Sequence, residues 1–473
     1  MLSRVFICIV SILSFLAACT PAAPSPTELP LAASATETPP STPQQTSTPE
    51  PSRTPKPTAT WVPVLLSKIE TPPEGCMDME LDLPGENMSD VAYLPSGYCF
   101  HGELDVFETG GRVYVAQVVL DTFPNSNVAF RIVDVSDVER PATVGVWEWN
   151  IPTYTSDVKA FRQGDRWYLA LSRDPSIDMD VRLCNLSGGI AIVEVTDPSN
   201  PKFLKILNGQ NTGGTKFWCN SHTAQVSRDA EGNGMYLYVS AVDIFDLRVL
   251  DIRDLENVVE AGRYTHPDAG FYNERNLFLV HDTTIVEDRV YVAYWSAGLI
   301  ILDREALETG KRVQPLNPLD SIDPWGLQTH QAFPTTDGQF VFVEDEFHSS
   351  VPESHLRLYD IRDLQSPKEV AAITLPDSLG APHNLLVSGN RLFVGWYQDG
   401  VRVFEYNTSD PEQPSVEPSA FKAVRSTRTS NSGISYDGIW GVRLHECELD
   451  GQPRTCVFAS DMAYGLLILA LEP

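Results

Sequence analysis

The chain has 473 residues, with 34 Lys and Arg against 63 Asp and Glu, which gives a formal net charge of −29 at pH 7. No basic run interrupts this imbalance, so nucleic acids and anionic lipid head groups are poor partners. The length allows one large domain or two ordinary ones.

The first eighteen residues predict a secretory signal. Arg4 precedes an apolar run that is too short for a membrane span. The run ends in Leu-Ala-Ala-Cys, which resembles a bacterial lipobox in which Cys19 becomes the lipid-bearing first residue. Thr20 follows, where an Asp is the usual signal for retention at an inner membrane. We therefore expect an exported bacterial protein that is bound to the membrane through its lipid alone and faces the cell exterior.

Residues 19–60 are dense in Pro, Thr and Ser and offer almost no large apolar side chains. Such a segment cannot bury a core, so it predicts a disordered tether. From Trp61 onward the composition changes to aromatic and β-branched residues. The sequence thus predicts three parts: a signal over residues 1–18, a tether over 19–60 and a folded domain over 61–473.

One strand pattern recurs seven times in the folded part. It reads "FRIVDVSDVERP" at Phe130 and "LRLYDIRDLQSP" at Leu356, and the other copies begin at Ile190, Leu247, Leu299, Val401 and Leu466. The starts of successive copies lie 45 to 65 residues apart, which suits four short antiparallel strands per unit. The sequence therefore predicts an all-β fold, a seven-bladed β-propeller in which this pattern forms the third strand of each blade.

The last copy reaches the end of the chain, so the seventh blade needs an outer strand from elsewhere. The segment Pro63–Glu70 is similar in sequence to the outer strands of the other units. We expect it to complete the seventh blade and to close the ring, which leaves no unpaired terminal edge.

The units resemble LVIVD repeats. The segments "THQAFPTTDGQFVFVEDE" and "PHNLLVSGNRLFVGWYQDGVRVFE" are similar to the choice-of-anchor B family of propeller proteins. The resemblance extends from Trp61 to Pro473 and is best from His281 to Glu405. It implies a bacterial surface-anchored propeller, and it implies no particular reaction.

The signal and the lipid anchor account for two of the eight cysteines, and six remain. An even number in an exported protein favours disulfides over metal or redox roles. One pair flanks an Asp-Gly dipeptide, a strong tight-turn signal. The expected pairs are Cys447 with Cys456, Cys76 with Cys99, and Cys184 with Cys219.

Four consecutive units place a histidine just before their first strand: His222, His281, His330 and His383. The start of the first strand and the end of the second lie at the same edge of a blade, because alternate strands run in opposite directions. The histidines should therefore surround one mouth of the central channel, together with carboxylates and aromatic rings from the second strands. The remaining units place Leu104, Ser156 and Trp440 at about the same position.

Two interpretations of these histidines are open. In the first, three or four imidazoles hold a transition metal ion, Cu, Fe or Zn, and Asp345 or Glu346 accepts a hydrogen bond from a ring N–H. In the second, each histidine is a polar group inherited with the repeat that hydrogen-bonds backbone between blades. The aromatic residues Trp295, Trp396 and Tyr397 either form the rim of a ligand pocket or pack blade against blade.

We expect a monomeric binding module whose loop-rich mouth meets an extracellular protein, glycan or small molecule. The alternative is a metal-dependent enzyme, for example an oxidoreductase, that uses the histidine cluster. The local signatures of serine hydrolases, P-loop proteins and zincins are absent from the sequence.

Overall fold

The computed structural model describes residues 83–98, 100–120, 127–149, 154–174, 188–214, 216–269, 278–323, 328–346, 356–375, 377–426 and 437–472. All of them belong to one compact unit, Val64–Pro473. The predicted signal, the tether and the predicted closing segment Pro63–Glu70 lie outside the described residues, as do Cys19, Cys76, Cys99 and Cys184. In the described part of the chain no helix is long and apolar enough to cross a membrane.

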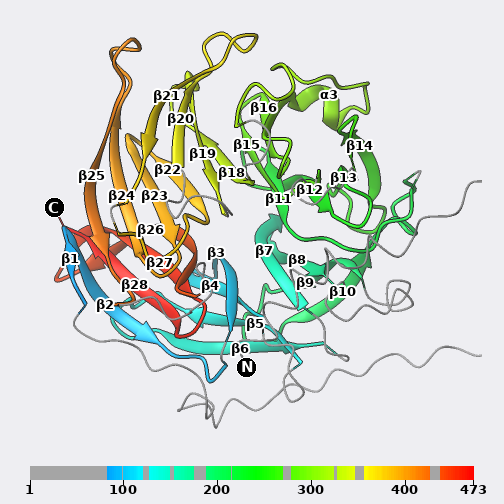
Figure 1. The fold of residues 1–473 in the computed structure, drawn as a ribbon. Helices are drawn as coiled ribbons and strands as arrows, with labels where there is room; N and C mark the ends of the chain where they lie inside the picture. Colours follow the sequence, from blue (N-terminus) through cyan, green and yellow to red (C-terminus); the bar gives the residue numbers. More distant parts are fainter. Residues whose placement is uncertain are drawn as a thin grey trace, which may run out of the picture. The chain divides into compact units, whose positions relative to one another are not determined.

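Seven antiparallel sheets follow one another along the chain, as predicted (Figure 1). The first three blades are formed by β3 (His101–Thr109), β4 (Arg112–Val119), β5 (Val128–Asp134) and β6 (Ala142–Glu148); by β7 (Tyr154–Gln163), β8 (Arg166–Asp174), β9 (Gly189–Glu194) and β10 (Lys202–Leu207); and by β11 (Ala224–Arg228), β12 (Gly234–Ala241), β13 (Asp246–Asp251) and β14 (Val259–Thr265).

The next two are formed by β15 (Asp282–Val286), β16 (Arg289–Ala293) and β17 (Leu299–Asp303), and by β18 (Thr329–Pro334), β19 (Phe340–Asp345), β20 (Leu356–Asp360) and β21 (Lys368–Ile373). The last two are formed by β22 (Leu385–Ser388), β23 (Arg391–Trp396), β24 (Gly400–Asn407), β25 (Ser415–Lys422) and β1 (Gly85–Glu86), and by β26 (Ile439–Leu449), β27 (Gln452–Asp461), β28 (Gly465–Leu471) and β2 (Met88–Leu94).

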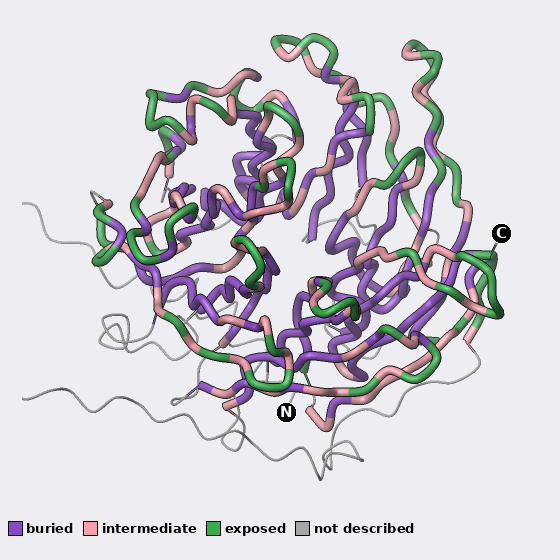
Figure 2. Tube along the Cα trace, turned by 180° about the vertical axis from the view of Figure 1, so that it is seen from behind, coloured by how far each residue is buried: buried purple, intermediate pink, exposed green. Residues whose placement is uncertain are grey.

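The repeated pattern forms the third strand of every blade, as predicted: β5, β9, β13, β17, β20, β24 and β28. These strands are apolar and buried along nearly their whole length because neighbouring blades cover both faces. The first strands contact one another in a closed cycle from β3 through β7, β11, β15, β18, β22 and β26 back to β3. Figure 2 shows that the buried residues concentrate on the inner strands and that the exposed residues gather at the loops and outer strands.

The ring is closed by an N-terminal strand, but the predicted segment was wrong. β2 pairs with β28 from Met88 opposite Leu471 to Leu94 opposite Leu466, so residues 88–94 occupy the outer position that residues 63–70 were expected to fill. An outer strand forms hydrogen bonds with one neighbouring strand of its sheet, and β2 is half-buried. Its sequence is therefore weakly constrained, and likeness to other outer strands is a poor guide to its position.

The fourth blade has three strands in the part of the chain that is described. After β17 the chain forms a short helix, α3 (Arg304–Glu308), whose N-cap Asp303 accepts a hydrogen bond from the backbone of Ala306. Beyond the helix, the amide of Leu316 donates to the Ile301 carbonyl at 2.8 Å, and the side chain of Asn317 donates to the Leu299 carbonyl at 3.0 Å. This segment satisfies the outer edge of β17 in place of a regular fourth strand.

The hairpin of β26 and β27 carries the disulfide Cys447–Cys456, as predicted. Its turn places Asp450 and Gly451 at φ of 52° and 69°, the positive angles that a two-residue hairpin turn requires. Cys219 is also disulfide-bonded, while its expected partner, Cys184, lies outside the described residues.

Candidate metal centre

In four of the blades an irregularity near the start of the first strand re-aims one side chain. In β18 the register shifts between Thr329 and Gln331, so His330 is the extra residue of a β-bulge. Ser156 in β7 and Trp440 in β26 occupy the same kind of position. Such bulges re-aim a side chain beside a site. His222, His281 and His383 stand just ahead of β11, β15 and β22, so they reach the same mouth by their equivalent position in the blade.

The four predicted histidines form a continuous row. The ring centroids of His222 and His281 lie 4.5 Å apart, those of His281 and His330 4.3 Å apart, and those of His330 and His383 4.1 Å apart. Trp440 continues the row, with its ring 4.4 Å from that of His383. The prediction that these side chains share one mouth is therefore confirmed in its geometry.

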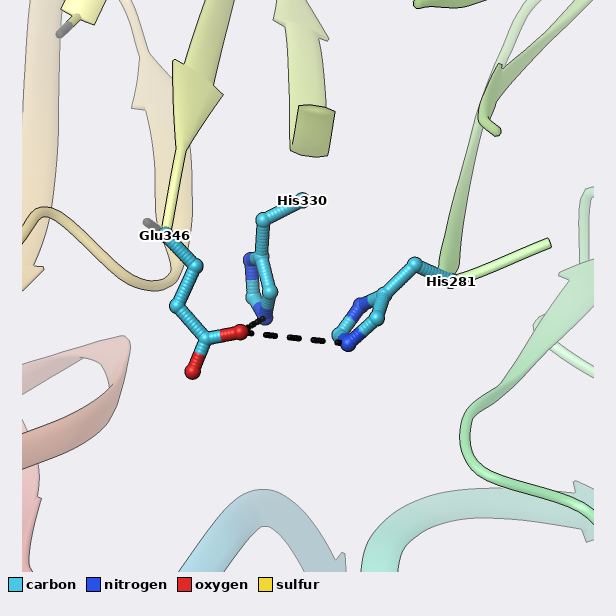
Figure 3. A group of neighbouring side chains, drawn as sticks. All are labelled: His281, His330 and Glu346. Carbon is cyan, nitrogen blue, oxygen red and sulfur yellow. Dashed lines mark ion pairs between the residues drawn. The ribbon is translucent and has the colours of Figure 1, made fainter. Parts of the chain in front are cut away.

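A single carboxylate faces three of the imidazoles. Figure 3 shows Glu346 beside His281 and His330, and one carboxylate oxygen lies 3.9 Å from the Nε2 atom of each ring. The other oxygen lies 3.9 Å from Nε2 of His383. The candidate ligand atoms of His281, His330 and Glu346 all lie within 4.8 Å of one another, and the three residues are buried.

The second nitrogen of two of these rings is already engaged. Nδ1 of His383 donates to the Trp440 carbonyl at 2.7 Å, so Nε2 of the neutral ring carries the lone pair. Nδ1 of His330 lies 2.5 Å from a carboxylate oxygen of Glu344. If a metal bound Nε2 of this ring, Nδ1–H would donate to Glu344, an arrangement typical of metal-bound histidines. The hydrogen bond between His383 and the Trp440 carbonyl also agrees with the second interpretation, in which each histidine hydrogen-bonds backbone between blades. It nevertheless leaves Nε2 of His383 available to a ligand.

Burial keeps all of these imidazoles neutral. It lowers the pKa of His383 to about 3 and the pKa values of His281 and His330 well below the ordinary 6.5. Burial also raises the pKa of Glu346 to about 7, although its hydrogen bond from the Tyr397 hydroxyl, at 2.5 Å, acts in the opposite direction. Neutral imidazoles are the form that binds metal ions.

The sequence analysis misassigned the supporting carboxylates. Asp345 forms an ion pair with Arg357 at 2.8 Å instead of contacting a histidine. Glu346 was expected to support a ring N–H, yet it faces the free Nε2 atoms. The carboxylate that does support a histidine is Glu344. The three acids are adjacent in the sequence, but alternation along β19 turns Asp345 away from Glu344, and Glu346 lies just beyond the end of the strand.

The three aromatic residues have different placements. Trp295 is half-buried and stacks on His281, with ring centroids 4.5 Å apart. Trp396 is fully buried in an apolar cluster with Phe404, so it lies in the core instead of at a rim. Tyr397 is also fully buried, and it holds Glu346.

Two of these aromatic residues adopt unusual backbone angles. Trp295 has φ of 46° and Tyr397 has φ of 26°, which bulky residues rarely adopt. The carbonyl of Trp295 accepts a hydrogen bond from Thr329, and that of Tyr397 accepts one from Ile439, each in the following blade. Backbone strain of this kind concentrates at functional sites.

The first blade differs from the prediction. Its bulge covers Gly102 and Glu103, while Leu104, the residue expected at the channel, is buried in an apolar cluster. Glu103 lines a cavity at the channel together with Ser156, His222 and others. His222 is half-buried at the open end of the histidine row.

Replacing Glu344 should weaken metal binding through His330. Glu344→Met removes the acceptor for Nδ1–H, and we expect the affinity for Zn²⁺ to fall by about ten- to a hundredfold, the usual cost of losing such a partner. Glu344→Gln keeps an acceptor oxygen and should lose less. Competition titration with a chromogenic chelator measures both affinities, and equal affinities in the two variants would contradict this role.

The fold has relatives among solved structures at low sequence identity. A Bacteroides fragilis protein provisionally named as a 6-phosphogluconolactonase is 13% identical, with a TM-score of 0.47, over 77% of this chain and 95% of its own. A Lactobacillus plantarum protein is 13% identical, with a TM-score of 0.48, over 75% and 94%. An ancestral GH74 enzyme is 12% identical, with a TM-score of 0.50, over 79% and 48%. These similarities concern the fold alone. No family model and no curated protein matches the chain.

Proposed function

We propose that this β-propeller binds a divalent transition metal ion with His281, His330, His383 and Glu346, and that the metal serves catalysis at the mouth of the channel. The observation that carries the proposal is the convergence of three imidazole Nε2 atoms on one carboxylate, each at 3.9 Å. This distance is too long for a hydrogen bond. A cation between His281, His330 and Glu346, whose ligand atoms lie within 4.8 Å of one another, would satisfy these three groups, and His383 would join them through a further side-chain movement.

The donor set suits Zn, Cu or Fe. Imidazole nitrogens bind these ions at about 2.0–2.1 Å and carboxylate oxygens at about 2.0–2.2 Å. Ligands at such distances in a tetrahedral site stand about 3.3–3.5 Å from one another, so the Nε2 atoms and the Glu346 oxygens, now 3.9 Å apart, need to approach by roughly half an ångström. Side-chain torsions supply that movement without a change in the backbone.

Export and lipid anchoring belong to the same proposal. The disulfide between Cys447 and Cys456, and the disulfide-bonded state of Cys219, support an oxidising compartment. The lipobox-like Leu-Ala-Ala-Cys at residues 16–19 supports attachment through Cys19. The second candidate function, a metal-free binding module for an extracellular ligand, keeps the same export and anchor but gives the histidines a purely structural role.

Metal analysis separates the two functions. A secreted protein beginning at Thr60, without added histidines, is stripped with chelator and titrated separately with Zn²⁺, Cu²⁺ and Fe²⁺. The proposal expects near-stoichiometric retention of at least one ion after desalting, measured by elemental mass spectrometry. A folded protein that retains none of them would leave the binding module as the function.

Metal affinity should depend on pH through Glu346. Its pKa is raised to about 7, so below pH 7 a proton competes with the metal for this carboxylate. The histidine pKa values are lowered, so these rings do not compete near neutrality. We expect the affinity for Zn²⁺ to rise about tenfold per pH unit up to pH 7 and to level off above it. Calorimetry from pH 5.5 to 8 checks this slope, and Glu346→Gln should bind more weakly and abolish it.

A further inference from the structure

A small cavity lies beside the proposed metal site and is lined in part by charged residues. Two of the proposed ligands, His330 and His383, line it, together with the charged residues Glu103, Asp157, Lys159 and Asp282. Glu346 is not among the residues that line it. Cu²⁺ and Fe²⁺ accept more than four ligands, so an ion held by the three histidines and Glu346 keeps an open coordination position. Because His330 and His383 line the cavity, that position would face it.

The charged lining residues, which we call the channel floor and define as Glu103, Asp157, Lys159 and Asp282, include three acids and one cation. Burial raises the pKa of Asp282 to about 7 and also raises the pKa of Glu103, so the floor is most negative above neutral pH. Lys159 forms an ion pair with Asp157, so one cation stands against three carboxylates. Outside the floor, Arg443 lies 3.4 Å from Glu103 and 3.3 Å from Asp105. Because this arginine is shared between two acids, it offsets the charge of Glu103 only in part.

The floor is also held rigidly. Asp282 accepts hydrogen bonds from the side chain of Gln331 at 3.1 Å and from the backbone of Thr283 at 2.5 Å. Asp157 accepts from the backbone of Val158 and of Ala224, each at 2.8 Å. These acids are buried and fixed between blades, so they cannot turn away when a ligand enters.

The cavity leaves about 10 Å³ for the centre of a water molecule. Roughly that much space holds one water. Its acidic floor offers hydrogen-bond acceptors and repels anions, because carboxylates in a site of low dielectric act strongly on a nearby charge.

We infer that the open position of the metal takes a water-sized, neutral hydrogen-bond donor, water first of all, and that the channel floor excludes anions of the same size. The inference rests on the proposed metal site. The channel floor would then select the ligand of the metal. A metal-bound water oriented by fixed carboxylates is the starting point of metal-assisted hydrolysis.

The test compares water with fluoride, an anion of similar size, on the Cu²⁺-loaded protein at pH 8. Paramagnetic Cu²⁺ speeds the ¹⁷O relaxation of any exchanging water that it binds and the ¹⁹F relaxation of any fluoride that it binds. We expect enhanced water relaxation and little fluoride binding in the unsubstituted protein. Glu103→Gln should raise the affinity for fluoride at least about tenfold, since it removes one floor charge without changing the shape.

Two further variants keep the result decisive. Lys159→Met removes the floor's cation and should weaken fluoride binding further. Glu108→Gln, on the same strand as Glu103 but with its side chain 62% exposed, should leave fluoride binding unchanged. Equal fluoride affinity in the unsubstituted protein and Glu103→Gln, both loaded with Cu²⁺, would overturn the inference while the metal site stands. Failure of the unsubstituted protein to bind Cu²⁺, Zn²⁺ or Fe²⁺ would overturn both.

Discussion

The double substitution His281→Ala/His330→Ala is expected to abolish stoichiometric metal binding. Both rings direct Nε2 toward Glu346 at 3.9 Å, so the variant removes two of four proposed ligands. Complete zinc sites bind with about 10–16 kcal/mol, so two ligands account for several kcal/mol and the affinity should fall by about a thousandfold or more. Elemental mass spectrometry after desalting, with competition titration, measures the loss.

The matched control for this experiment is His445→Ala. His445 lies in the same ring of blades, but it contacts Glu108 near the outside and does not belong to the histidine row. It should retain full metal content. If the double variant is folded and still holds its ion with unchanged affinity, the site is elsewhere and the proposed ligand set is refuted. Circular dichroism confirms the fold of both variants.

Removal of β2 is expected to prevent stable folding. A protein that begins at Pro95 lacks Met88–Leu94, which pairs with β28 along its whole length. The edge of β28 would lose its hydrogen-bonded partner and become open to other chains. The Leu94 carbonyl, which accepts from the fully buried Arg131 at 2.9 Å, would also be missing. One guanidinium N–H of Arg131 would then lose its acceptor inside the protein, which is costly.

A protein that begins at Leu83 retains both β1 and β2 and serves as the control. We expect it to unfold cooperatively, whereas the shorter protein should aggregate or melt at least about 10 °C lower, given a loss of several kcal/mol. A synthetic peptide of residues 84–95 added to the shorter protein should restore part of the difference. Equal melting temperatures for the two proteins would show that β2 does not close the ring.

The histidine row was predictable because it depends on periodicity. Each blade repeats the same strand order, so a residue that precedes the first strand in several units must reach the same mouth. His222, His281, His330 and His383 therefore lie together in the structure as expected. The disulfide Cys447–Cys456 was predictable for a similar local reason, since a two-residue turn brings its flanking strands together and leaves the two cysteines as diagonal neighbours across the hairpin.

The supporting groups were not predictable in the same way. Glu344, Asp345 and Glu346 are adjacent in the sequence, yet one supports His330, one pairs with Arg357 and one faces three imidazoles. Alternation along β19 separates Asp345 from Glu344, the bulge at His330 sets the position of that ring, and Glu346 lies just beyond the strand. The channel floor likewise draws on blades one, two and four, whose residues are far apart in the chain.

By itself, the sequence determined the seven-fold repeat, the third strand of every blade and the set of histidines at one mouth, because each follows from a period or from a local turn. The tertiary structure alone decided which N-terminal segment closes the ring, which carboxylate faces the imidazoles, and that Trp396 is buried while Trp295 stays partly exposed. These choices depend on contacts between blades, where packing and hydrogen bonding select among residues that look alike in the sequence.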